Sequence, residues 1–402
     1  MDEIAPASAK ASNRKNLMVL AFTLAVLMLG YGMVIPVMPF LIDRMGASGT
    51  ELGLLVASYG VVKLVFSPMW GALSDRVGRR PILVIGVIGN GLAMLFFGLA
   101  TEMWMLFAAR IFSGLLTSAT SPTAFAYIAD STSERDRGGG MGILGAAMGV
   151  GTIFGPGLGG WLAGDSLSTP FFLTAGLCLV SAVLILLLLP ETRTPRARTM
   201  DLRSEAASTL GLSRRVLIGP VGLLLFLSLV ATSGALMFYS VFGLYALEKF
   251  AYGPEQVGTI LVIMGIVSTL AQGGLTGPLT KRWGEAKVVN AAMLGSVAGF
   301  LAFLQARSYP TILLTTGFFI LANALLVPAV TALLSRQATG QQGKLMGWNN
   351  AAMSLARIIG PLGAGFAFDL DYDYPFIGGA AIMAIGFLLS LKQAIGTSIR
   401  GT

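Results

Sequence analysis

Long apolar stretches recur along the whole chain, and they restrict its fold more than any other feature of the sequence. A helix needs roughly 20 residues to cross a hydrocarbon core of about 30 Å, and lipid accepts only structures whose backbone groups are hydrogen-bonded internally. Hydrophobic residues make up 55% of the 402 residues, and charged residues make up only 11%. The sequence therefore predicts an all-α integral membrane protein.

Twelve such stretches can be counted, each bounded by charged or turn-forming residues. We expect membrane-spanning helices at residues 17–41, 52–73, 82–100, 103–127, 140–163, 169–190, 218–246, 256–278, 288–306, 310–335, 346–367 and 375–393. The predicted domains are an N-terminal tail at 1–16, a six-helix bundle at 17–190, a linker at 191–217, a second six-helix bundle at 218–393 and a C-terminal tail at 394–402.

The distribution of lysine and arginine predicts the orientation of the chain. If the N-terminus lies inside the cell, the tails, the linker and the inner loops hold most of the 27 cationic side chains. Only Arg44, Lys249 and Arg307 then fall in outer segments. Cytoplasmic loops of membrane proteins carry such an excess of cations, so both termini are predicted to be cytoplasmic. The same excess explains the net charge of +8 without a nucleic-acid partner.

Three cations, Lys63, Arg110 and Arg357, fall inside predicted helices. All 19 acidic residues fall in loops or at helix ends, so no carboxylate inside the predicted spans neutralises these cations. Charged residues at this depth are costly and usually mark a functional site. Their presence predicts a polar site within the membrane.

The composition argues against a membrane-embedded enzyme. The chain has no histidine, and its single cysteine, Cys178, has no partner for a disulfide or a cysteine metal site. A nucleophile, a metal cluster or a pair of acids at membrane depth is also missing. We expect no enzyme activity, no cofactor and no bound metal.

Two motifs recur at nearly one spacing. The segment 71–80 (GALSDRVGRR) aligns with 277–286 (GPLTKRWGEA), an offset of 206, and 154–160 (FGPGLGG) aligns with 359–365 (IGPLGAG), an offset of 205. A parallel repeat of six helices with a substrate site between the halves is typical of transporters. The internal repeat argues against a passive channel, and we therefore expect a transporter built from two repeated bundles.

Four motifs, in order, resemble the major facilitator superfamily, and within it the twelve-span drug:proton antiporters. They are LGYGMVIPVMP at 29–39, GALSDRVGRRP at 71–81, LFAARIFSG at 106–114 and GTIFGPGLGG at 151–160. The resemblance implies alternating access, proton-coupled efflux of small molecules and multidrug resistance. It also implies residence in the bacterial cytoplasmic membrane, and we expect a monomer there.

The resemblance also implies roles for motif residues. A cytoplasmic gate would be formed by Gly71, Asp75, Arg76, Gly78 and Arg79, in which Asp75 and Arg79 lock the gate against the second half. The alternative is that the arginines only set the orientation of the chain.

A second set of motif residues is rich in glycine and proline. Small residues let helices pack backbone to backbone, and proline bends a helix. We interpret these residues as a helix-packing motif that serves conformational change, and they are Gly151, Gly155, Pro156, Gly159, Gly160, Pro36 and Pro39.

Arg110 lies in the fourth predicted helix, on one face with Ser113, Thr117 and Ser121. It is either a relay for protons or substrate, or a structural arginine bound to neighbouring carbonyls and hydroxyls. Both interpretations stay open at the level of sequence.

The sequence departs from the tetracycline antiporters at one position. These antiporters carry an aspartate three residues before the G-x-G of the first-helix motif, and Leu27 occupies that place here. The departure weakens the case for tetracycline and for cationic drugs generally.

Lys63 shares a helix face with Tyr59 and Ser67, and Arg357 shares one with Asn350. In the fold that the resemblance implies, the helices of Lys63 and Arg357 meet, so the two cations would share one cavity. Paired Lys and Arg would hold an anion. Tyr31 and Tyr239 are further predicted lining residues.

We therefore expect export of an anionic or zwitterionic amphiphile. The alternatives are efflux of neutral or cationic drugs, and a lipid flippase of the same fold. Lys63 could also extend to the membrane surface, or be neutral and carry the proton itself. Further candidates for proton transfer are an acid group of the substrate and the carboxylates Asp43, Asp130, Glu248 and Glu255.

Overall fold

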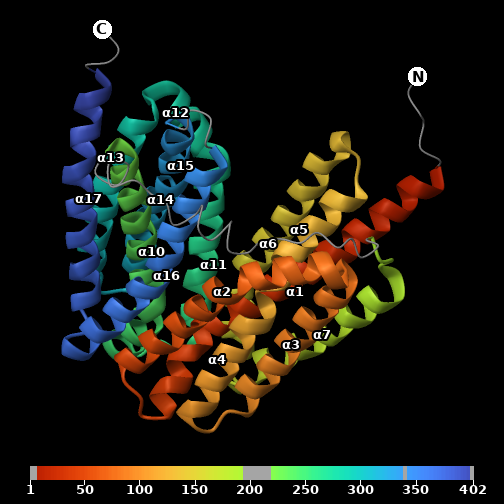
Figure 1. Cartoon of the computed structure of the whole chain (residues 1–402). Coiled ribbons are helices and arrows are strands. Elements are labelled where there is room, and N and C mark those ends of the chain that lie inside the picture. Colours follow the sequence, from red (N-terminus) through yellow and green to blue (C-terminus); the bar gives the residue numbers. More distant parts are fainter. Residues whose placement is uncertain (1–6, 193–218, 338–341, 399–402) are drawn as a thin grey trace. The chain divides into compact units, whose positions relative to one another are not determined.

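The computed structural model describes residues 7–192, 219–337 and 342–398 (Figure 1). This part of the chain is entirely helical, with twelve helical spans long and apolar enough to cross a membrane. The predicted fold class is confirmed. The helices of the first half are α1 (Ala7–Arg44), α2 (Gly49–Val77), α3 (Arg79–Leu99), α4 (Met103–Thr117), α5 (Thr120–Ser131), α6 (Glu134–Leu162) and α7 (Thr169–Leu188).

Three of the twelve spans each consist of more than one helix. In these spans α4 continues into α5, α11 continues into α12 through a π-helical turn, and α14 continues into α15. The helices of the second half are α10 (Pro220–Phe250), α11 (Pro254–Leu270), η1 (Ala271–Leu275), α12 (Thr276–Trp283), α13 (Glu285–Leu304), α14 (Tyr309–Ala324), α15 (Leu326–Arg336), α16 (Gln342–Leu370) and α17 (Tyr374–Ser398).

Helices at both ends of the chain are longer than the predicted spans. Helix α1 begins at Ala7, inside the stretch 1–16 that was predicted as a tail, and α17 continues to Ser398. Alanine and lysine near the start of α1 are good helix formers, so the helix can continue beyond the apolar stretch. The predicted linker at 191–217 lies almost wholly outside the described residues, and the predicted bundle boundaries stay a prediction.

Contacts divide the chain into two compact units. Unit 1 comprises Met1–Gly46, Ser58–Met200 and Tyr252–Val262, and unit 2 comprises Ala47–Ala57, Asp201–Ala251 and Ile263–Thr402. The boundaries between the units fall inside α2 and inside α11. The first turns of α2 belong to unit 2 and its remainder to unit 1, whereas the first turns of α11 belong to unit 1 and its remainder to unit 2.

The packing inside the two units follows one pattern. In unit 1, α1 packs along α6 and α3 along α7; in unit 2, α10 packs along α16 and α13 along α17 (Figure 1). A glycine with positive φ precedes α3 and α13 at equivalent positions, Gly78 (φ 110°) and Gly284 (φ 80°). Residues other than glycine rarely adopt this backbone conformation. The internal repeat predicted from the sequence is thus present in the fold.

Glycine lets α6 lie directly against the backbone of α1. A Cβ at Gly155 would lie 2.7 Å from the carbonyl oxygen of Leu29, and one at Gly159 would lie 2.7 Å from the Cα of Met33. Gly151 faces the same helix one turn earlier. On the other side of α6, a Cβ at Gly160 would lie 2.8 Å from the Cα of Gly258. Any larger side chain would push these helices apart.

The remaining residues of the helix-packing motif interrupt helices without ending them. Pro36 and Pro39 lie inside α1, and Pro156 lies inside α6. All three prolines are buried. A proline removes one backbone hydrogen bond from a helix and tends to bend it.

The core of unit 2 is aromatic. Phe238 of α10 stacks on Phe242 and Phe319, with ring centroids 5.3 and 4.9 Å away. Phe303 and Phe376 pack edge-on against the same ring. Phe238 and Phe242 are fully buried in this cluster, so these rings stabilise the bundle by packing.

Candidate functional site

Unit 1 encloses a small cavity, called here the cationic cavity. Its walls come from α1, α2, α3, α4 and the start of α5, and its lining residues are Leu27, Met28, Tyr31, Tyr59, Lys63, Asn90, Met94, Arg110, Ser113, Thr117 and Ser121. These described residues include two cations and no Asp or Glu.

Tyr59 lies at the centre of the polar contacts in the cationic cavity. The Lys63 ammonium is 5.5 Å from the centre of the Tyr59 ring, and the Arg110 guanidinium carbon is 5.3 Å from it. The Tyr59 hydroxyl is 3.3 Å from Thr117 Oγ1, and the Tyr31 ring centre lies 5.6 Å from the Tyr59 ring centre. One tyrosine thus contacts both cations of the cavity.

Arg110 is almost completely buried, with 4% of its surface exposed. Its guanidinium lies near the rings of Tyr59 and Phe97, whose faces attract a cation. The Arg110 Nε has no hydrogen-bond partner among the described residues. A buried donor without a partner costs about 1–3 kcal/mol, so an acceptor entering the cavity would be held there.

The other predicted cavity residues lie elsewhere. Ser67 is half-buried on α2 and does not line the cationic cavity. Arg357 and Asn350 are exposed on α16, and Tyr239 is half-buried on α10; these three belong to unit 2. A cavity shared by Lys63 and Arg357 therefore stays a prediction.

Sequence reasoning missed the neighbour of Asn350. Asn349 is 3% exposed, and its Oδ1 accepts a hydrogen bond of 2.6 Å from the Ser228 hydroxyl. This bond joins α16 to α10 inside the bundle. The signal was ambiguous because two adjacent asparagines point to different faces of a helix.

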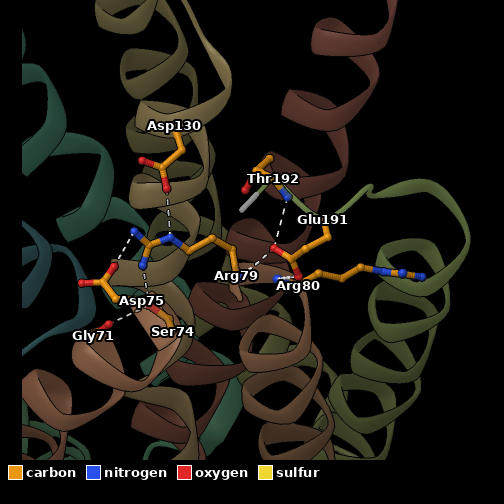
Figure 2. Close-up of polar contacts among 8 residues, drawn as sticks. All are labelled: Gly71, Ser74, Asp75, Arg79, Arg80, Asp130, Glu191 and Thr192. Carbon is orange, nitrogen blue, oxygen red and sulfur yellow. Dashed lines mark hydrogen bonds and ion pairs between the residues drawn. The ribbon is translucent and has the colours of Figure 1, made fainter. Parts of the chain in front are cut away.

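A second polar site, the gate cluster, lies where α2 ends and α3 begins (Figure 2). Its members are Ser74, Asp75, Arg79 and Asp130. The Arg79 guanidinium forms ion pairs with Asp75 at 2.7 Å and with Asp130 at 3.1 Å. It also donates a hydrogen bond to the Ser74 hydroxyl, which in turn donates to the carbonyl of Gly71. Arg79 thereby connects α2, α3 and α5.

Two further residues of the same motif contribute differently. Arg76 is exposed. A Cβ at Gly71 would meet no atom within 4 Å, so Gly71 permits no close helix contact in this structure. The gate role of both residues stays a prediction.

Glu191 lies beside Arg79 at the start of α3, although it is the first residue of the predicted linker. Its carboxylate accepts hydrogen bonds from the backbone N–H groups of Arg79 (2.9 Å) and Arg80 (3.1 Å), as Figure 2 shows. These groups begin α3, where an anion is favourable. An acid placed just after α7 was the available signal, but nothing in the sequence showed which helix start it would reach.

The second half contains a counterpart of the gate cluster with inverted charges. The offset of 206 relates Asp75, Arg79 and Asp130 to Lys281, Glu285 and Arg336. The structure pairs the buried Glu285 carboxylate with Arg336, as it pairs Arg79 with Asp130. The offset that identified the repeat could have identified this inversion.

The inverted charges explain why a separate carboxylate, that of Glu191, is needed at the start of α3 but not at the start of α13. Arg79 is the first residue of α3, where its positive charge is unfavourable, and Glu191 compensates for it. Glu285 is the first residue of α13 and brings a favourable negative charge itself.

We expect the pair Glu285 and Arg336 to be interchangeable in charge. Glu285→Lys should lower the free energy of unfolding by about 1–2 kcal/mol, since it places two cations together and removes a partly desolvated pair. Adding Arg336→Glu should restore at least half of that loss. A double-mutant cycle on the protein in detergent measures the coupling. Simple additivity of the two changes would contradict the pairing.

Two repeated six-span bundles, with a cavity lined by two cationic side chains in the first, are typical of transporters, and comparison with known proteins identifies the family. The model of the Major Facilitator Superfamily matches residues 20–275 and 224–394. The chain belongs to this superfamily of transporters. The predictions of the family, of a transporter instead of an enzyme, and of a multi-pass membrane protein are confirmed.

The relatives include named resistance proteins. Multidrug resistance protein 2 of Bacillus subtilis is 33% identical over 375 residues, which cover 93% of this chain and 94% of that protein. Quinolone resistance protein NorA of Staphylococcus aureus is 27% identical over 379 residues, which cover 94% and 96%.

Among solved structures, a bacterial homologue of the human lysosomal transporter Spinster superposes with a TM-score of 0.80 at 14% identity. The match covers 94% of this chain and 97% of that one. The human organic anion transporter MFSD10 (TETRAN) gives a TM-score of 0.64 at 23% identity, covering 96% and 100%. At these identities the likeness concerns the fold.

Proposed function

We propose that the protein exports small amphiphilic compounds by alternating access, in exchange for protons, and that it favours compounds carrying an anionic group. Export is supported by the relatives, which are named for resistance to multiple drugs or to quinolones. The preference for an anionic group is supported by the cationic cavity, where Lys63 and Arg110 meet no carboxylate among the lining residues.

The proposal depends on the charged and polar side chains that line the cationic cavity. The lining combines two cations, two tyrosines, one asparagine and three hydroxyl side chains of α4 and α5 with leucine and methionine. Such a lining matches the chemistry of a ligand with one charged end and an apolar or aromatic body. The cavity has a volume of about 10 Å³ in this structure, so it would have to widen during the transport cycle to admit such a ligand. An ammonium end alone would meet two positive charges, which disfavours a simple cationic drug.

The gate cluster supports a role in conformational control. Arg79 is buried between two carboxylates that come from different helices. Movement of α2 relative to α5 would have to break one of these ion pairs. We propose that Asp75 and Arg79 hold one state of the transport cycle in this way, at the end of the bundle that the positive-inside rule places in the cytoplasm.

The proposal is tested with purified protein in liposomes. An aromatic carboxylate, its neutral amide and the corresponding amine are supplied as matched probes, with and without an imposed pH gradient. We expect the carboxylate to be transported at least about tenfold faster than the amide, and an inward proton gradient to accelerate export of the aminomethyl derivative of the carboxylate, which carries both charges. The amine transported fastest would favour the alternative of cationic drugs, and movement of lipid alone would favour a flippase.

A further inference from the structure

Proton exchange needs a group that can bind and release a proton, and the cationic cavity offers only a few. Lys63, Arg110, Tyr31 and Tyr59 are the titratable residues among those that line it. Helix α3 contributes Asn90 and Met94 to the same wall, and neither of them titrates. Arginine does not lose its proton in proteins. The choice is therefore between Lys63 and the two tyrosines. Lys63 is proposed to bind the carboxylate of the substrate, and losing its proton on binding would remove the charge that this contact needs, which leaves the tyrosines.

Tyr59 is the tyrosine that both cations contact. The Lys63 ammonium and the Arg110 guanidinium lie 5.5 and 5.3 Å from its ring centre. Tyr31 interacts electrostatically with Arg110, but it has no ring contact with Lys63 among the described residues. A Tyr59 phenolate would be the counterion of Lys63 and Arg110.

The hydrogen bond between Thr117 and Tyr59 can reverse its direction when the charge of Tyr59 changes. The Thr117 hydroxyl donates to the Ser113 carbonyl at 2.7 Å, so the hydroxyl of Tyr59, 3.3 Å away, is the donor of the bond between Tyr59 and Thr117. A threonine hydroxyl can rotate. After Tyr59 loses its proton, the Thr117 hydroxyl can turn and donate to the phenolate oxygen instead.

We propose that Tyr59 is the proton-binding residue of the cationic cavity, and that the substrate exchanged for this proton is a zwitterion. The inference rests on the proposed function. The substrate carboxylate would bind Lys63 and Arg110, and its ammonium would bind the Tyr59 phenolate. The O–H bond of Tyr59 breaks as the substrate binds, and the proton passes to bulk water. On release of the substrate, the phenolate oxygen takes a proton from water again.

The positive charge of the zwitterion decides the direction of coupling. A simple anion adds only negative charge beside Tyr59, so it favours the protonated phenol and binds together with the proton. A zwitterion places an ammonium where the proton was, so the substrate and the proton exclude each other. Exchange of one for the other requires this competition, and by linkage the zwitterion must bind more tightly as the pH rises.

The test uses para-(aminomethyl)benzoate as the zwitterion and para-methylbenzoate as the matched anion. Calorimetry in two buffers of different ionisation enthalpy gives the protons exchanged per ligand bound to the purified protein. In the wild type we expect the zwitterion to release protons and the anion to release none. In Tyr59→Phe, which keeps the ring, the zwitterion should still bind but release no proton. The ultraviolet difference spectrum of tyrosinate should appear with the zwitterion only in the wild type.

The outcomes separate this inference from the proposed function. If neither probe binds, the proposed anion site is wrong, and the inference fails with it. If the probes bind but Tyr59→Phe releases protons as the wild type does, only the role of Tyr59 is overturned. Loss of proton release in Tyr31→Phe instead of Tyr59→Phe would also overturn it, as would equal proton exchange with the two probes.

Discussion

Replacing Arg79 with alanine is expected to destabilise the protein and to reduce transport by more than tenfold. The side chain is buried and connects Asp75 with Asp130, so its removal leaves two carboxylates close together without the shared cation. Breaking a fully buried pair costs about 3–5 kcal/mol. Both carboxylates are about one-third exposed, at 35% and 33%, so we expect a loss of about 2–3 kcal/mol, reduced from that range by solvent screening.

Unfolding of the purified variant in detergent and transport in liposomes measure the two effects of Arg79→Ala. Arg76→Ala is the matched control for stability, since Arg76 lies in the same motif but is exposed; a surface substitution of this kind changes stability by less than about 0.5 kcal/mol. Arg79→Lys keeps the charge but lacks the planar guanidinium fork that reaches Ser74, Asp75 and Asp130 in fixed geometry, so its stability and transport should fall between those of the wild type and Arg79→Ala. Stability and transport unchanged in Arg79→Ala would show that the gate cluster has no role in holding a state.

Replacing Lys63 with alanine is expected to weaken the binding of an aromatic carboxylate by roughly 10- to 100-fold. A hydrogen bond to a charged group contributes about 1.5–3 kcal/mol, and 1.4 kcal/mol corresponds to a factor of ten in affinity. Lys287→Ala, at an exposed lysine of α13, is the matched control and should leave the affinity unchanged. The measurement is direct titration of the purified protein with the probe.

Arg357→Ala tests the predicted sharing of one cavity. If Arg357 and Lys63 hold the same carboxylate, both variants weaken binding, and the combined variant loses less than the sum of the two changes. If Arg357 plays no part, only Lys63→Ala has an effect. Unchanged affinity and unchanged transport in both variants would remove the anion hypothesis altogether.

Much of the fold was predictable because membrane insertion leaves few choices. The lengths of the apolar stretches determine the twelve spans, and the offset between Gly78 and Gly284 marks the repeat, since both positions require positive φ. Helix ends were less predictable. Nothing in the apolar pattern shows that α1 already begins at Ala7, because a helix can continue into water without a change in hydropathy.

The candidate site was predictable in its chemistry and less so in its geometry. Spacing on a helix correctly indicated that Lys63 and Tyr59 lie close together, because residues four apart share a face. It could not show that Arg110 of another helix reaches the same tyrosine. Contacts between distant segments, such as Glu191 at the start of α3, depend on the packing of whole helices and leave no local signal.

We propose that the cations of the cationic cavity select the charge of the substrate. The most direct test is the ratio of two affinities, that of an aromatic carboxylate and that of its neutral amide, in the wild type and in Lys63→Ala. We predict a wild-type preference for the carboxylate of at least about tenfold, or 1.4 kcal/mol, which falls towards equality in Lys63→Ala. Equal affinities in the wild type, or a preference that is unchanged in Lys63→Ala, would show that Lys63 does not select the charge of the substrate.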